Sequence, residues 1–175
     1  ALSNIANLGQ SKAEAAARTA KIINPAVEIR PMARPLNRST ARSILKGMDV
    51  VVDALNSIHD RLMLQKAAQG LGIPMVHGAI AGFVGQVMAI FPGDQGLKHL
   101  YGDKIPPRKQ KTKSAESILG VPAPAPCMIA SLQAAEVIKL LLNRGRTFRN
   151  RLMCLDLENS DFNEVSFESP ASSEP

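Results

Sequence analysis

The run Asp49-Val50-Val51-Val52-Asp53-Ala54-Leu55-Asn56-Ser57 sets the architecture of the surrounding chain. Its apolar, β-branched residues lie between polar ends, which is typical of a central strand covered on both faces. Residues 58–71 follow with apolar side chains at helical spacing opposite polar ones such as Arg61, and Met75–Ala81 is apolar again. A strand, a helix and a second strand within about 30 residues predict a right-handed parallel crossover unit. We therefore expect an α/β fold.

Further elements are expected on both sides of this unit. Helical spacing with a Ser11 cap and Glu14 three residues later predicts a helix over Lys12–Ile23, which Asn24-Pro25 ends. The other predicted elements are a short strand at Val27–Met32, a short helix at Thr40–Leu45, an antiparallel strand at Gln86–Phe91, a strongly apolar helix at Met128–Leu142 and a hairpin of Leu152–Leu157 with Glu164–Phe167. The connection Pro92–Pro126 shows little strand or helix patterning.

Composition and charge exclude several classes of protein. The 175 residues suit one domain or part of a larger one, and no apolar run approaches the ~18 residues needed to cross a bilayer, so we expect a cytoplasmic protein without a membrane partner. The net charge of +6 comes almost entirely from one loop with two prolines, so no nucleic-acid partner is expected. That loop is either solvated or a lid or docking segment, and its cations are Lys104, Arg108, Lys109, Lys111 and Lys113.

Candidate site residues follow the first strand. Ligands of open parallel sheets bind beyond the carboxyl ends of strands, where Asp53, Asn56 and Ser57 could orient a magnesium-bound phosphate or a ribose. The alternative is that Asn56 or Ser57 only caps the next helix. Lys12 could supply a charge to phosphates or be a solvated surface lysine. His77 reads either as a hydrogen-bonded core residue or as a proton-transfer group.

Cysteine usage suggests little more. Cys127 comes immediately before the predicted apolar helix, whose amino end would stabilise a thiolate, but a small buried cysteine is the alternative. Two cysteines are too few for a disulfide scaffold or a tetrahedral zinc site.

Several segments, taken in order, resemble the HesA/MoeB/ThiF family, the prokaryotic relatives of ubiquitin-activating enzymes. The likeness covers about residues 9–168 and rests on order and spacing more than on any single motif. The matching segments are Gly9-Gln10-Ser11-Lys12-Ala13 with Ile23-Asn24-Pro25, Asp49–Ser57 with Arg61, Ile73-Pro74 with Gly78–Gly82 and Gly85-Gln86-Val87, Ser131–Lys139, and Leu155-Asp156.

The resemblance implies a Rossmann-like, mostly parallel sheet with helices on both faces, followed by antiparallel carboxyl-terminal strands. It also implies ATP-magnesium as cofactor and a homodimer that adenylates the carboxyl-terminal glycine of a ubiquitin-like sulfur carrier, for thiamine- or molybdopterin-type sulfur transfer. Lys12 and Asn56 would be catalytic, and the nucleotide would be bound by Lys12, Leu36, Asp53, Asn56, Ser57 and Arg61. The segment 92–126 would be the crossover loop that covers the carrier's tail.

The sequence also departs from the family pattern. The glycine-rich nucleotide loop would precede Leu2, so we expect residues 1–168 to be a partial domain, inactive alone, with 169–175 as a flexible tail. Asn56 replaces the magnesium-binding aspartate, and amide oxygen is a weaker magnesium ligand than carboxylate. Paired Cys-x-x-Cys motifs are missing, so no structural zinc is expected. The alternative is a non-catalytic relative that serves dimerisation or carrier binding.

Overall fold

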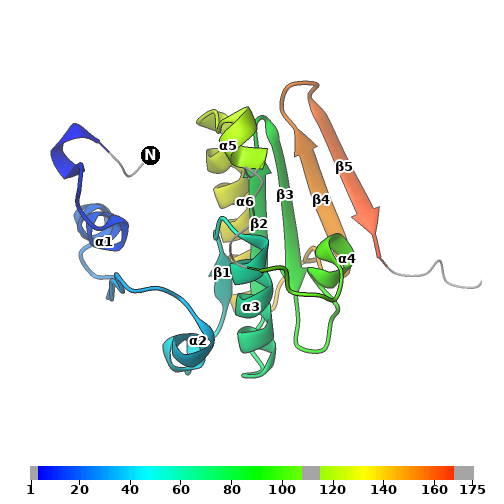
Figure 1. Ribbon diagram of the computed structural model, residues 1–175, viewed down its shortest axis with the longest axis horizontal. Helices are drawn as coiled ribbons and strands as arrows, with labels where there is room; N and C mark the ends of the chain where they lie inside the picture. Colours follow the sequence, from blue (N-terminus) through cyan, green and yellow to red (C-terminus); the bar gives the residue numbers. More distant parts are fainter. Residues whose placement is uncertain (1–3, 108–114, 168–175) are drawn as a thin grey trace, which may run out of the picture. The chain divides into compact units, whose positions relative to one another are not determined.

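The computed structural model describes residues 4–107 and 115–167, which belong to two compact units, Ala1–Leu36 and Asn37–Pro175 (Figure 1). The first unit contains a 3-10 turn, Ile5–Asn7, and helix α1, Lys12–Ile23. Helix α1 has the predicted bounds, and the Ser11 hydroxyl accepts a hydrogen bond from the Glu14 N–H at 3.4 Å. The strand predicted at 27–32 is wrong: this segment is irregular, because no described strand pairs with it.

The second unit is built on a five-stranded sheet in the order β1-β2-β3-β4-β5 (Figure 1). Strands β1 and β2 are parallel, with Asp53 opposite His77, and the remaining neighbours are antiparallel. The α/β fold with antiparallel carboxyl-terminal strands is confirmed, and β1–β2 is the parallel pair among the described strands. The strands are β1 Val51–Asp53, β2 Met75–Ala81, β3 Val84–Ile90, β4 Arg151–Asp156 and β5 Asp161–Ser166.

Two strands differ from their predicted form. Strand β1 is an edge strand of the described sheet, and Val52 is 48% exposed, so the prediction of a central strand covered on both faces is wrong. Its other side has no described strand to pair with. Strand β3 begins at Val84 because the β2–β3 turn needs only Gly82 and Phe83. Gly82 has φ +59°, the left-handed conformation that such two-residue hairpin turns require at their first position.

Helices cover both faces of the sheet, as predicted. Successive side chains of a strand point to opposite faces. Val76 packs against Ile129 of α6, Pro124–Leu141, whereas His77 contacts Arg61 of α3, Ile58–Gln69. Helix α6 therefore lies on one face and α3 on the other, and α2, Arg38–Leu45, packs against α3. The helix predicted at Thr40–Leu45 is confirmed, with a start two residues earlier.

The connection between β3 and α6 carries more structure than its sequence predicts. It contains two short helices, α4 Lys98–Tyr101 and α5 Ala115–Leu119. Residues 108–114 and 168–175 are outside the described parts of the chain, so four cations of the basic loop and the predicted tail are not placed.

Helix α6 starts at Pro124, four residues before the predicted start, because proline is favoured in a first helical turn. Cys127 therefore lies inside this helix rather than before it, and its thiol is exposed. The wide apolar face predicted for burial is partly exposed at Met128, Ile138, Leu141 and Leu142. None of the helices in the described ranges has the length and apolar character to cross a membrane.

Candidate functional site

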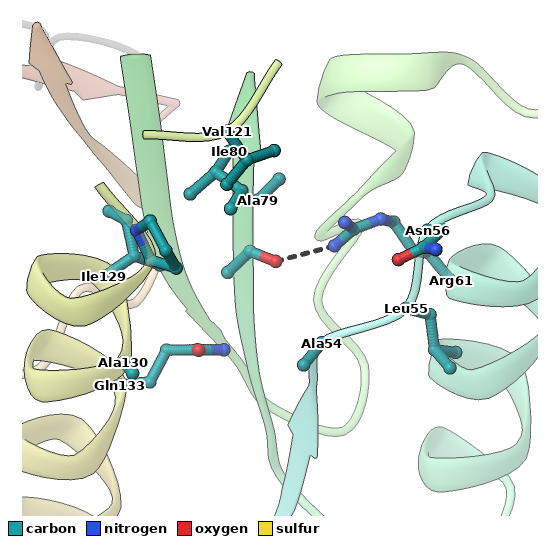
Figure 2. Close-up of a pocket in the computed structure, with 12 residues that line it drawn as sticks. Ala54, Leu55, Asn56, Arg61, Ala79, Ile80, Val121, Ile129, Ala130 and Gln133 are labelled. Atoms are coloured by element: carbon teal, nitrogen blue, oxygen red, sulfur yellow. Dashed lines mark hydrogen bonds between the residues drawn. The ribbon is translucent and has the colours of Figure 1, made fainter. Parts of the chain in front are cut away.

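A cavity of about 340 Å³ opens at the carboxyl end of β1, alongside the second half of β2 (Figure 2). This is the edge of the sheet where the sequence predicts a ligand site. Most of the lining is apolar. Its polar side chains come from the loop after β1, from α3 and from α6. The lining residues are Ala54, Leu55, Asn56, Arg61, Gly78, Ala79, Ile80, Val121, Pro126, Ile129, Ala130 and Gln133.

Arg61 provides the positive charge at this cavity. The sequence places it on the polar face of its helix, but its side chain is only 6% exposed. Its Nη1 donates to Oδ2 of Asp53 at 3.0 Å and to the carbonyl oxygen of Gly78 at 2.6 Å, the contact drawn in Figure 2. Its position on the polar face of the helix does not make it solvated, because the buried carboxylate at the end of β1 draws the guanidinium inward.

Asp53 is fully buried and its carboxylate is occupied by protein donors. Oδ2 accepts from His77 Nδ1 at 2.7 Å as well as from Arg61, and Oδ1 accepts from the Leu55 N–H at 2.9 Å. Burial alone would raise the pKa of Asp53, but the hydrogen bond from His77 and the charge of Arg61 bring this pKa below its ordinary value. Asp53 therefore holds Arg61 in place and does not itself line the cavity.

His77 is a core residue whose two ring nitrogens both have partners, which confirms the core interpretation. Because a carboxylate only accepts, Nδ1 carries the proton and donates to Asp53. Nε2 then accepts from Nε2 of Gln86 at 3.2 Å, and the same amide nitrogen donates to the Tyr101 hydroxyl at 3.2 Å. Burial lowers the pKa of His77, against the opposing effect of Asp53, so the imidazole is neutral.

The other predicted site residues have different positions. Ser57 is the N-cap of α3, and its hydroxyl accepts from the Asp60 N–H at 3.0 Å, so the capping interpretation is confirmed for this residue. Asn56 is exposed and lines the cavity. Lys12 is exposed at the start of α1 and Leu36 is half-buried at the end of the first unit. Their contribution to the same site stays a prediction.

Gln133 is a cavity residue that the sequence reading missed. It is 6% exposed, and its Nε2 donates to the backbone carbonyls of Asp53 at 2.9 Å and Val76 at 3.3 Å. Its amide occupies the space beside Gly78, where an added Cβ would lie 2.4 Å from the Gln133 Cδ. The signal in the sequence was a single amide within the most apolar helix, since a buried polar side chain needs partners.

The cavity side chains do not form a magnesium site by themselves. Magnesium in nucleotide sites is usually held by one or two carboxylates together with phosphates and water. The lining offers amide oxygens of Asn56 and Gln133 but no carboxylate. Within residues 4–107 and 115–167, no group of three His, Cys, Asp or Glu side chains could hold a metal ion.

The model of the ThiF family matches residues 1–175 of this sequence. The chain belongs to the ThiF family. Among its ThiF-type relatives, the SAMP-activating enzyme E1 of Haloferax volcanii is 32% identical over 161 residues, covering 92% of this chain and 58% of that protein. The sulfur carrier protein adenylyltransferase of Thermus thermophilus is 31% identical over 167 residues, covering 91% of this chain and 60% of that protein. The chain thus spans about three-fifths of the length of these curated relatives.

Solved structures support the ThiF-type fold. E. coli MccB, crystallised with ATP, superposes with a TM-score of 0.74 at 17% identity, covering 98% of this chain and 52% of MccB. PaaA superposes with a TM-score of 0.68 at 14% identity, covering 95% of this chain and 50% of PaaA. At these identities the likeness concerns the fold.

Proposed function

We propose that this chain is part of an adenylyltransferase that uses ATP to activate the carboxyl-terminal glycine of a ubiquitin-like sulfur-carrier protein, for thiamine- or molybdopterin-type sulfur transfer. Membership of the ThiF family and the names of the two relatives described above support this reaction class. The observation that carries the proposal is the cavity at the end of β1 with a buried, fixed arginine at its wall.

The proposed reaction needs positive charge and hydrogen-bond donors. A carboxylate oxygen of the carrier attacks the α-phosphorus of ATP, the bond from that phosphorus to the bridging oxygen breaks, and pyrophosphate leaves. Negative charge builds on phosphate oxygens in this step, and fixed donors stabilise it best when they do not have to reorganise. Arg61 meets that requirement, because Asp53 and the Gly78 carbonyl hold its guanidinium in one position. It would contact the phosphate or the attacking carboxylate.

The remaining roles follow the family resemblance. Lys12 would contact the phosphates, Leu36 would pack against the nucleotide, and Asn56 and Ser57 would lie at the end of the phosphate chain. Asp53 acts through Arg61 as a positioning residue. Magnesium would accompany the nucleotide, with phosphates and water as its main ligands.

We further propose a homodimer in the cytoplasm. The exposed apolar side chains of α6 and its C-cap Leu142 would be buried between two copies, since apolar patches of this kind usually mark interfaces. The segment 92–126 would lie over the carrier's extended tail.

A second candidate is a non-catalytic relative that binds a carrier or dimerises. Asn56 favours it, because the family resemblance assigns an aspartate to this position and an amide holds magnesium more weakly.

ATP–pyrophosphate exchange separates the two candidates. The full gene product is assayed with candidate carrier proteins, as wild type, as Arg61→Lys and as the control Arg149→Lys, whose arginine pairs with Asp94 outside the cavity. Adenylation is supported if Arg61→Lys abolishes the exchange and the control variant retains it. Lysine should not replace Arg61 because it lacks the planar fork of donors. Carrier binding without exchange supports the second candidate.

A further inference from the structure

The amide of Gln133 has only one orientation that its partners allow. Its two neighbours at hydrogen-bond distance, the backbone carbonyls of Asp53 and Val76, can only accept. Both N–H groups of the side chain are therefore used on them, and Oε1 faces away from these carbonyls. The hydrogen bonds of Gln133 to the described residues are both made by Nε2, and the residue is 6% exposed and lines the cavity. This oxygen is not one of the fully enclosed polar atoms that lack a partner, so it opens into the cavity and can accept from a donor bound there.

Gly78 places this acceptor beside the cationic donor. An ideal Cβ at Gly78 would lie 2.7 Å from Oε1 of Gln133, so the amide can approach only because this residue has no side chain. The carbonyl of the same residue accepts from Nη1 of Arg61 at 2.6 Å. One acceptor and one guanidinium therefore flank a single residue of β2, and Figure 2 shows them reaching toward this strand from opposite sides.

We propose that Oε1 of Gln133 accepts the backbone N–H of the last residue of an extended peptide tail whose terminal carboxylate faces Arg61. This inference rests on the function proposed above and identifies the residue that recognises the tail. A carboxyl-terminal residue carries an N–H donor and a carboxylate on the two sides of one Cα, so it offers one group to the acceptor and one to the guanidinium. The small side chains of Ala79 and Ala130 leave room for such a backbone in the cavity.

Two peptides that differ only in the N–H of the last residue test this hydrogen bond. We would use a synthetic hexapeptide ending in Gly-Gly and an analogue in which the last amide is an ester, so that oxygen replaces the N–H. The full gene product is titrated with each peptide, and the side-chain amide signal of Gln133 is followed by NMR. The wild type should bind the ester about 3- to 10-fold more weakly, the range for one hydrogen bond.

Two variants separate recognition from structure. In Gln133→Met the amide and ester peptides should bind equally, because the acceptor is gone. Gln65→Met is the control, since Gln65 is also buried and bonded, to the Gln95 carbonyl and the Leu97 N–H, but lies outside the cavity. This control should keep the wild-type ratio between the peptides.

Several results would overturn the inference. These are equal binding of both peptides by the wild type, the wild-type ratio in Gln133→Met, or a shift of the Gln133 signal with adenosine monophosphate but not with the peptide. If Gln133→Met does not fold, the wild-type ratio and the Gln133 signal decide alone. If pyrophosphate exchange occurs but the wild type binds both peptides equally, the proposed function stands and this inference is wrong. If the wild type prefers the amide peptide but no exchange occurs, the contact with Gln133 stands and the proposed adenylation is wrong.

Discussion

Replacing Asp53 by Asn would leave the Arg61 guanidinium buried without its counter-charge. The substitution keeps the size of the side chain, so it creates no void, and the amide oxygen can still accept from the Leu55 N–H. What is lost is the charged Oδ2, which accepts from Arg61 at 3.0 Å and from His77 at 2.7 Å. Breaking a buried ion pair by removing one partner typically costs about 3–5 kcal/mol, and the Arg61 side chain is 6% exposed. We expect Asp53→Asn to lower the free energy of unfolding by this amount, which is about one fifth or more of the roughly 5–15 kcal/mol of an ordinary domain.

Urea unfolding at pH 7.5 measures this loss in the second unit. Tyr101 is the only tyrosine of a chain without tryptophan, so its fluorescence reports on this unit. Asp103→Asn is the matched control, because Asp103 pairs with Lys98 at 3.2 Å with its side chain 83% exposed. Exposed pairs contribute little, so this control should unfold at nearly the wild-type urea concentration. The reasoning fails if Asp53→Asn costs no more than Asp103→Asn.

Three further changes have expected outcomes. Burial lowers the pKa of His77 in the folded chain, so just below the ordinary pKa of 6.5 only the unfolded chain takes up a proton at this residue. The free energy of unfolding should therefore fall as the pH decreases through 6.5, by at most about 1.4 kcal/mol per pH unit. His77→Asn, which keeps a donor toward Asp53, should flatten this slope in urea unfolding; an unchanged slope contradicts the assignment. Gly78→Ala should cost about 1–3 kcal/mol in the same assay, because its Cβ would overlap Gln133, and a neutral effect would show that the helix can shift. Asn56→Asp should lower the magnesium concentration that half-saturates pyrophosphate exchange, whereas an unchanged titration means that Asn56 does not contact the metal.

Much of the fold could be predicted from local patterns. Helices α1 and α3 and strand β2 were found with bounds correct to within two residues, because each has a clear apolar period and a capping or breaking residue at its ends. The strand predicted at 27–32 and the central position of β1 were wrong for a physical reason. Strand pairing depends on neighbours elsewhere in the chain, and the described part offers none on those sides.

The sequence by itself also determined the edge of the sheet where the cavity lies and the family to which the chain belongs, since both depend on the order of short segments. Only the tertiary structure decided what the side chains at that edge do. The carboxylate of Asp53 holds Arg61, 8 residues away, in a buried position. The backbone carbonyl of Asp53 accepts from the amide nitrogen of Gln133, 80 residues away, and so turns the amide oxygen to the cavity. Helical spacing describes which face of a helix is polar, but hydrogen bonds between distant segments determine which polar groups are buried and which way they point.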